Sequence, residues 1–230
     1  GMSGLPKPFY EDGSVTIYHG DCRELLPLVE GDFLLTDPPY GLDVADTYSS
    51  LSGSPEFNAK KGHYRGKKYP KIYGDAEPFD PSHLLGAAAK SVIWGADHFS
   101  DSLPRSRGWL IWDKREELGS NMLSDAEVAW ASFPTPTRIF RHKWLGYMRA
   151  SEVGFHVHPT QKPVALMAWV IGKWCGEAET ILDPYMGSGP VMRAAKDLGR
   201  KAIGIELEER YCEIAAERCS QEVLDLGAAA

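Results

Sequence analysis

The sequence predicts an α/β fold built on one sheet of roughly seven mostly parallel strands with helices on both faces. First, short apolar runs alternate along the chain with amphipathic helical patterns. Second, several of these runs end in Asp, Glu or Gly, the kind of residue that binds ligands at the carboxyl edge of a parallel sheet. Third, 230 residues suit one sizeable domain over 1–230, since two full domains would be cramped.

Seven apolar runs have the length and composition of strands. The run 33–36 has the composition of a buried strand and leads directly into Asp37. Two other runs end near Asp183 and Glu206. The seven predicted strands are 15–18, 33–36, 91–94, 109–112, 127–131, 180–182 and 201–205.

Five helices are predicted from apolar residues at helical spacing. Pro27 shortens the first, Asp80 and Pro81 open the second, Pro163 opens the third, which ends at Trp174, and Gly199 ends the fourth, which Pro190 begins. Their inward-facing residues are Cys22, Leu25, Leu26 and Val29 in the first; Leu84, Leu85 and Ala88 in the second; Val191, Ala194, Ala195 and Leu198 in the fourth; and Leu207, Tyr211, Ile214 and Ala215 in the last.

The composition favours a cytoplasmic protein with no membrane-spanning segment and no metal site. No apolar run is long enough to cross a bilayer, and the start, 1–4, lacks the basic and apolar regions of a signal peptide. The four cysteines form no C-x-x-C pair, and no His stands at zinc-ligand spacing from them. We therefore expect reduced thiols and no metal site.

Two regions are predicted to carry loops: 41–75, which is a long loop, and 115–157, in which 134–157 is irregular. The chain carries a net charge of −7, which argues against polyanion binding over the whole surface. Within the two loops, however, basic and aromatic residues are concentrated at 60–71 and 138–149. The alternative is that both segments are simply solvated loops.

The segment Asp183–Gly189, D-P-Y-M-G-S-G, is a glycine-containing turn between a predicted strand and helix. Glycines let the backbone approach a ligand, and the helix start offers free N–H groups. Glu206 ends the next strand, where a carboxylate can accept hydrogen bonds from both hydroxyls of a ribose. The pair indicates a nucleoside-cofactor site, although a plain turn with an exposed Glu is the alternative. It lacks the third glycine of a dinucleotide fold and the Lys of a P-loop.

The segment Asp37–Tyr40, D-P-P-Y, follows a predicted buried strand. Two prolines fix the backbone and remove two N–H donors, which leaves a surface rich in acceptors. The Asp37 carboxylate and the Pro38 carbonyl can each accept one N–H of a planar amino group, while Tyr40 stacks on the attached ring. A proline-rich turn without function is the alternative.

These two segments, together with 158–163, H-P-T-Q-K-P, resemble the DNA amino-methyltransferases. The family motifs are D-P-P-Y, H-P-T-Q-K-P and D-P-F-x-G-S-G-T, and the order found here is that of the beta class, a circular permutation of the Rossmann-like methyltransferase fold. The resemblance covers roughly residues 15–220. Tyr185 stands where Phe is usual, and Pro190 where Thr is usual.

The resemblance implies roles for individual residues. Asp37, Pro38 and Tyr40 would hold the target amine and base. Thr160 and Lys162 would reach the amino-acid end of the cofactor, S-adenosyl-L-methionine, and Asp21 would accept a hydrogen bond from its adenine amine, unless Asp21 is only a helix cap. The residues that would hold its methionine and ribose parts belong to the glycine turn and the next strand: Asp183, Tyr185, Gly187, Ser188, Gly189 and Glu206.

The implied activity is methylation of the exocyclic amino group of a base flipped out of double-stranded DNA. D-P-P-Y favours adenine N6, because S-P-P-Y is commoner for cytosine N4. Cytosine N4 methylation and a non-catalytic DNA-binding module remain the alternatives. The basic loops are the candidates for DNA contacts, and sequence specificity resides in them, in a partner, or in the second copy of a homodimer.

Overall fold

The computed structural model describes residues 4–41, 77–116, 119, 124–145, 148–152, 161–177 and 179–221. Most of the predicted loop 41–75, part of the loop 115–157, and Thr160 lie outside these residues. No helix among the described residues is long and apolar enough to span a membrane.

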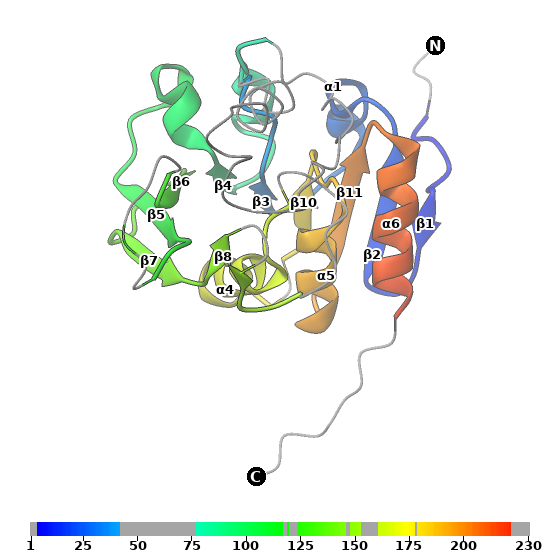
Figure 1. Cartoon of the computed structure of the whole chain (residues 1–230). Coiled ribbons are helices and arrows are strands. Elements are labelled where there is room, and N and C mark those ends of the chain that lie inside the picture. The colour runs from blue at the N-terminus through cyan, green and yellow to red at the C-terminus, as the bar shows by residue number, and fades with distance from the viewer. Residues whose placement is uncertain are drawn as a thin grey trace, which may run out of the picture.

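Nine strands of the described chain form one mixed sheet, in the order β1-β2-β11-β10-β3-β4-β6-β5-β7, and a separate two-stranded sheet holds β8 and β9 (Figure 1). The strands are β1 (Tyr10–Glu11), β2 (Val15–His19), β3 (Phe33–Thr36), β4 (Lys90–Trp94), β5 (Gly108–Asp113), β6 (Ala126–Ala131), β7 (Arg138–Arg141), β8 (Trp144–Leu145), β9 (Met148–Arg149), β10 (Ile181–Asp183) and β11 (Ala202–Glu206).

The Rossmann-like α/β prediction is confirmed, and each of the seven predicted strands is present. Strands β2, β11, β10, β3 and β4 are mutually parallel, whereas β6 runs antiparallel to β4 and β5. Two further strands, β1 and β7, extend the sheet at its edges. The segment 138–141 falls within a predicted loop but forms β7, because an edge strand needs no buried face: Ile139 is 49% exposed.

Helices cover the two faces of the sheet unequally. On one face α5 (Pro190–Asp197) lies between α4 (Val164–Trp174) and α6 (Glu209–Ser220), and they pack on the largest apolar cluster (Figure 1). The other face carries α1 (Cys22–Leu25) and three 3₁₀ helices, η1 (Leu26–Leu28), η2 (Ser82–Leu84) and η3 (Ala96–Ser102). The central strand β3 is buried along its whole length because both faces are covered.

Three details of the helix predictions were wrong. The helix predicted from Asp80 is only the single turn η2: the Asp80 carboxylate accepts from the Ser82 N–H, but Gly86, at φ 84°, follows too soon for a longer helix. Leu198 is 41% exposed because it lies just past the last turn of α5. Leu207 is 38% exposed because α6 begins two residues later.

Candidate active site

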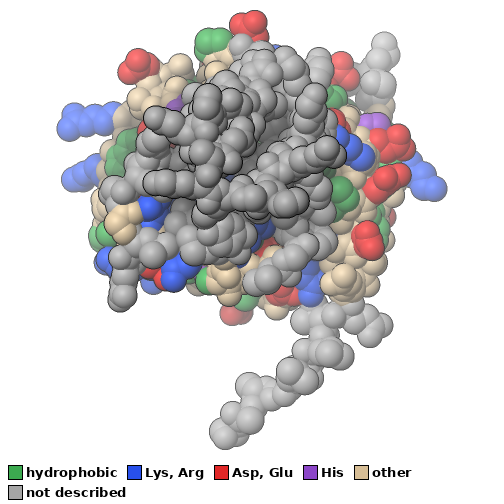
Figure 2. Space-filling view, in the orientation of Figure 1, with side chains coloured by type: hydrophobic (Ala, Val, Ile, Leu, Met, Phe, Trp, Pro, Cys, Tyr) green, Lys and Arg blue, Asp and Glu red, His purple; other side chains and the backbone are tan. Residues whose placement is uncertain are grey.

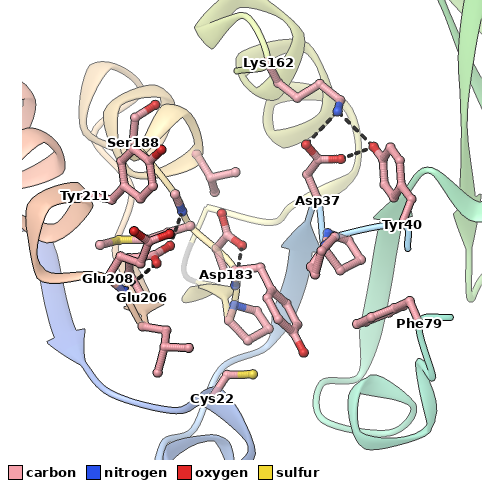
Figure 3. A pocket seen from close by; sticks show the side chains of 18 of the residues that line it. Cys22, Asp37, Tyr40, Phe79, Lys162, Asp183, Ser188, Glu206, Glu208 and Tyr211 are labelled. Carbon is pink, nitrogen blue, oxygen red and sulfur yellow. Dashed lines mark hydrogen bonds and ion pairs between the residues drawn. The ribbon is translucent and has the colours of Figure 1, made fainter. Parts of the chain in front are cut away.

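Four carboxylate side chains lie at the same edge of the sheet. Asp21 and Asp37 follow β2 and β3, and Asp183 and Glu206 end β10 and β11. These four strands are parallel, so their carboxyl ends meet at one edge, where open α/β sheets bind ligands. All four residues line one cavity of about 320 Å³ (Figure 3).

The glycine turn after β10 is held by Glu206. Gly187, at φ 51°, and Gly189, at φ 74°, let the chain turn into α5, and Pro190 begins that helix. One carboxylate oxygen of Glu206 accepts from the Gly187 N–H at 2.9 Å, and the other accepts from the Glu208 N–H at 2.8 Å. Burial raises the pKa of Glu206, while these N–H groups lower it.

We expect Gly189→Ala to destabilise the protein by about 2–4 kcal/mol. A Cβ at Gly189 would lie 2.8 Å from the Cβ of Ala215, in a left-handed conformation that disfavours side chains. Gly172→Ala is the matched control, because a Cβ there, in the last turn of α4, meets nothing within 4 Å; this variant should be more stable than wild type by about 0.5–1 kcal/mol. Urea unfolding of both variants measures the difference, and equal stabilities would contradict this packing.

Asp183 is a buried carboxyl group at the floor of the cavity, 2% exposed. One of its oxygens accepts from the Thr36 hydroxyl at 2.7 Å and from the Tyr185 N–H at 3.2 Å. Burial raises the pKa of Asp183 to about 7, the charges of Asp37 and Glu206 add to the rise, and the two hydrogen bonds oppose it. Asp183 is therefore poised to ionise near neutral pH and suits a ligand with a positive charge.

The cavity walls fit a nucleoside cofactor with an amino-acid end. The hydroxyl of Ser188 is buried and has no hydrogen-bond partner among the described residues, so it can serve a ligand in the glycine turn. Phe79 and Tyr185 pack edge to face at 5.6 Å and supply aromatic surface. The Tyr185 hydroxyl, in the place where Phe is usual, is hydrogen bonded to His83 at 2.7 Å.

Asp21 lines this cavity but also caps a helix. Its carboxylate accepts from the Arg23 N–H at 2.8 Å as the N-cap of α1. The capping alternative is thus present in the structure, and the role toward adenine stays a prediction.

The D-P-P-Y segment forms the opposite end of the cavity. The Asp37 carboxylate accepts from the Tyr40 hydroxyl through one oxygen and from the Lys162 ammonium group through the other, at 2.6 Å (Figure 3). Lys162 also donates to the Tyr40 hydroxyl at 2.9 Å. Burial raises the pKa of Asp37, opposed by Lys162. Asp37 and Tyr40 are therefore brought together as predicted, with Pro38 beside them on the cavity wall.

The ring of Tyr40 is supported from behind. His98, on η3, stacks on it with ring centroids 4.9 Å apart. Gly95 lies against it so closely that a Cβ there would come within 1.9 Å of a ring carbon. The Tyr40 ring thus packs on His98, and the Lys162 ammonium group lies 5.3 Å from the ring centroid.

Lys162 lines the same cavity, and its role toward the cofactor stays a prediction. The resemblance assigns it to the cofactor's amino-acid end, but its ammonium group contacts Asp37 and, at 3.0 Å, Glu127. The backbone carbonyl of Gln161 accepts from the Trp144 indole, and the Glu152 carboxylate accepts from the Val164 N–H, which fixes this segment. Thr160, predicted to act with Lys162, lies outside the described residues.

Sequence reasoning missed Glu127 and Lys114. Glu127 on β6 bridges Lys162 and Lys114, both at 3.0 Å. In the sequence Glu127 is one polar residue at the start of a predicted strand. Only the pairing of β6 with β5, which sets Glu127 opposite Trp112, brings it to the edge of the sheet where Asp37 lies.

The described part of the second basic segment is partly neutralised. Arg141 pairs with Asp113 at 3.6 Å, and Lys143 pairs with Glu116 at 3.3 Å. Both signs of charge are interspersed over the described part of the face in Figure 2. The first basic segment, 60–71, lies outside the described residues, so DNA contact by either segment stays a prediction. Among the described residues no group of three or more His, Cys, Asp or Glu side chains could hold a metal ion.

The sequence is similar to two curated methyltransferases. It is 27% identical over 272 aligned positions to the type II methyltransferase M.ScaI of Streptomyces caespitosus, covering 96% of this chain and 86% of that protein. It is also 27% identical, over 258 positions, to the type II methyltransferase M2.LlaDCHI of Lactococcus lactis subsp. cremoris, covering 94% and 93%.

The fold matches those of solved DNA methyltransferases. A complex of M1.HpyAVI with SAM has a TM-score of 0.56 at 22% identity, over 90% of this chain and all of that chain. The PvuII DNA methyltransferase, which is cytosine-N4-specific, has a TM-score of 0.62 at 16% identity, over 94% and 90%. The family model described as DNA methylase matches residues 93–217, more than half of the chain. This protein therefore belongs to the N6/N4 family of DNA methylases.

Proposed function

We propose that this DNA methylase transfers a methyl group to the N6 amino group of an adenine flipped out of double-stranded DNA. The observation that carries the proposal is the cavity of about 320 Å³ with Asp37 and Tyr40 at one end and Asp183 and Glu206 at the other. A base amine and a nucleoside cofactor can thus meet in one enclosed site.

S-adenosyl-L-methionine supplies the methyl group on a sulfonium sulfur. Glu206, Ser188 and the glycine turn would hold its ribose and methionine parts, and the Asp183 carboxylate would accept from its ammonium group. Two of the solved neighbours, M1.HpyAVI and TTHA0409 of Thermus thermophilus, contain SAM, which supports this cofactor.

An exocyclic amine is a poor nucleophile because its lone pair is delocalised into the ring. The Asp37 carboxylate and the Pro38 carbonyl would each accept a hydrogen bond from one N–H of the amine, which turns the lone pair toward the methyl donor. The ring of Tyr40 would stack on the base. The negative charge of Asp37 would stabilise the positive charge that grows on nitrogen as the N–C bond forms. The sulfur–methyl bond would break with its electron pair left on the sulfur, and the methylated nitrogen would then release one proton to water.

The choice of adenine as the target base depends on the D-P-P-Y motif. D-P-P-Y is the form more typical of N6-adenine enzymes, although cytosine presents a similar amine and the neighbour from the PvuII system is cytosine-N4-specific. The basic segments at 60–71 and 138–149 would contact the phosphate backbone of the DNA.

The test is incubation of the purified protein with unmethylated bacterial DNA and S-adenosylmethionine carrying a tritiated methyl group, followed by nucleoside analysis of the digest. Label in N6-methyladenosine is expected. Label in N4-methylcytidine would retain the mechanism and replace the base. The DNA should contain every short recognition sequence. If it then gains no label while the protein still binds the cofactor, a non-catalytic DNA-binding module is favoured.

Cofactor binding is expected to tighten as pH rises through about 7. Below that pH Asp183 is protonated and cannot pair with an ammonium group, so the apparent Kd should be about tenfold higher at pH 6 than at pH 8. Calorimetric titration at several pH values measures this change. Asp183→Asn should flatten the dependence, whereas Asp37→Ala should keep it with a midpoint at lower pH, because the charge of Asp37 adds to the rise in the pKa of Asp183. A dependence that survives Asp183→Asn would contradict the assignment.

A further inference from the structure

A row of alternating charges runs outward from the D-P-P-Y segment: Asp37, Lys162, Glu127 and Lys114. Lys162 is 2.6 Å from Asp37 and 3.0 Å from Glu127, and Lys114 is 3.0 Å from the other oxygen of Glu127. The side chain of Lys162 is only 4% exposed. This ion pair is therefore shielded from solvent, where charges interact far more strongly than at a surface.

Four separate segments meet in this row. Asp37 follows β3, Lys162 precedes α4, Glu127 belongs to β6, and Lys114 follows β5. Because β6 runs antiparallel to β4 and β5, its first residues lie at the edge where the parallel strands end. Glu127 thus reaches the site from the part of the sheet that holds no other proposed catalytic residue.

Lys162 without Glu127 would act against the proposed chemistry. Its ammonium group neutralises Asp37, yet the amine becomes positive during methyl transfer and is disfavoured beside an unopposed positive charge. Glu127 contacts Lys162 through one oxygen and Lys114 through the other, so the charge of Lys162 is opposed by two carboxylates and the row of four groups is neutral. Glu127 also gives the flexible side chain of Lys162 a second anchor, so the ammonium is fixed against one oxygen of Asp37.

We propose that Glu127 is a positioning residue of the methyl-transfer site, which holds Lys162 against Asp37 and opposes the positive charge of Lys162 near the target amine. This inference rests on the proposed function, since it concerns the same Asp37 carboxylate. Glu127 touches neither base nor cofactor in this role; it acts through Lys162.

The pKa shifts agree with this geometry. Burial would raise the pKa of Glu127, but Lys162 and Lys114 outweigh it and lower that pKa to about 2, so Glu127 stays ionised. Burial raises the pKa of Asp37, Lys162 opposes the rise and Glu127 adds to it. The other groups that act on this pair are Tyr40, through its hydrogen bond to Asp37, and Asp183, which is coupled to Asp37 by charge.

Glu127→Gln tests the role because it keeps the shape and removes the charge. We expect kcat to fall on the order of 10- to 100-fold, with cofactor Kd near the wild-type value. The acid limb of the kcat profile should move to lower pH, because a negative neighbour of Asp37 is gone. Glu127→Asp keeps the charge and should recover part of kcat and the wild-type limb.

Glu179→Gln is the matched control, since Glu179 forms a similar pair with Lys90, at 2.9 Å, away from the cavity. It should leave kcat and the acid limb unchanged. The proposal is overturned if Glu127→Gln has the kcat of wild type. It is also overturned if Glu127→Gln and Glu127→Asp lose kcat equally while the acid limb of the kcat profile stays at the wild-type pH in both. Should Glu127→Gln not fold, ammonium exchange in Glu127→Asp decides alone: the shorter side chain should loosen the contact with Lys162 and speed the exchange, and unchanged exchange would overturn the proposal.

A readout independent of activity separates this proposal from the proposed function. The held ammonium of Lys162 should give a slowly exchanging ¹⁵N–¹H signal, assigned by its loss in Lys162→Arg. That signal should broaden in Glu127→Gln and persist in Glu179→Gln. If wild type transfers no methyl group but this pattern holds, the proposed function fails and the positioning contact stands; an unchanged signal in Glu127→Gln overturns the contact.

Discussion

Replacing Asp37 by alanine is expected to lower kcat for DNA methylation by at least about 10³-fold while the Kd for S-adenosylmethionine stays within a few-fold of wild type. The variant removes the carboxylate that is proposed to accept from the amine and to stabilise its growing positive charge. Asp183 and Glu206, which are proposed to hold the cofactor, end other strands, β10 and β11, and Glu206 keeps its hydrogen bonds to the Gly187 and Glu208 N–H groups. Single-turnover kinetics and calorimetric titration measure the two quantities separately.

The fold should tolerate this change, because Lys162 keeps Glu127 and the Tyr40 hydroxyl as partners. Asp197→Ala is a suitable control: Asp197 pairs with Arg193 within α5 and is 38% exposed. It should alter neither kcat nor Kd. An Asp37→Ala variant with wild-type kcat would refute the proposed mechanism.

Glu206→Gln is the change expected to weaken cofactor binding most, by about 10- to 100-fold in Kd. The carboxylate accepts one N–H through each oxygen, and an amide can accept through only one. The NH₂ group would oppose either the Gly187 or the Glu208 N–H, so the turn shifts and one acceptor for the ribose is lost.

The measurement is the Kd for S-adenosylmethionine, with DNA affinity determined in parallel. DNA affinity should stay near wild type because Glu206 lies at the cofactor end of the cavity, and Glu213→Gln, on the exposed side of α6, should change neither. Wild-type cofactor affinity in Glu206→Gln would remove Glu206 from the cofactor site.

The sequence by itself determined the fold class and most of the site. The seven principal strands were located from short apolar runs in the sequence. A strand that is buried on both faces of a parallel sheet must be apolar along its length, so it leaves such a run. The motifs placed Asp37, Asp183 and Glu206 at strand ends, and parallel strands bring their carboxyl ends to one edge without further information. Local chemistry was therefore enough for these residues.

Only the tertiary structure decided where Lys162 and Glu127 act. Lys162 follows a segment that the motif alone assigns to the cofactor, but the packing of the Gln161–Val164 segment on Trp144 and Glu152 directs its ammonium group to Asp37. Glu127 reaches the site through antiparallel pairing of β6, and strand order and register depend on contacts between residues distant in sequence. The edge strand β7 was not predicted, because an exposed strand carries little apolar pattern in the sequence.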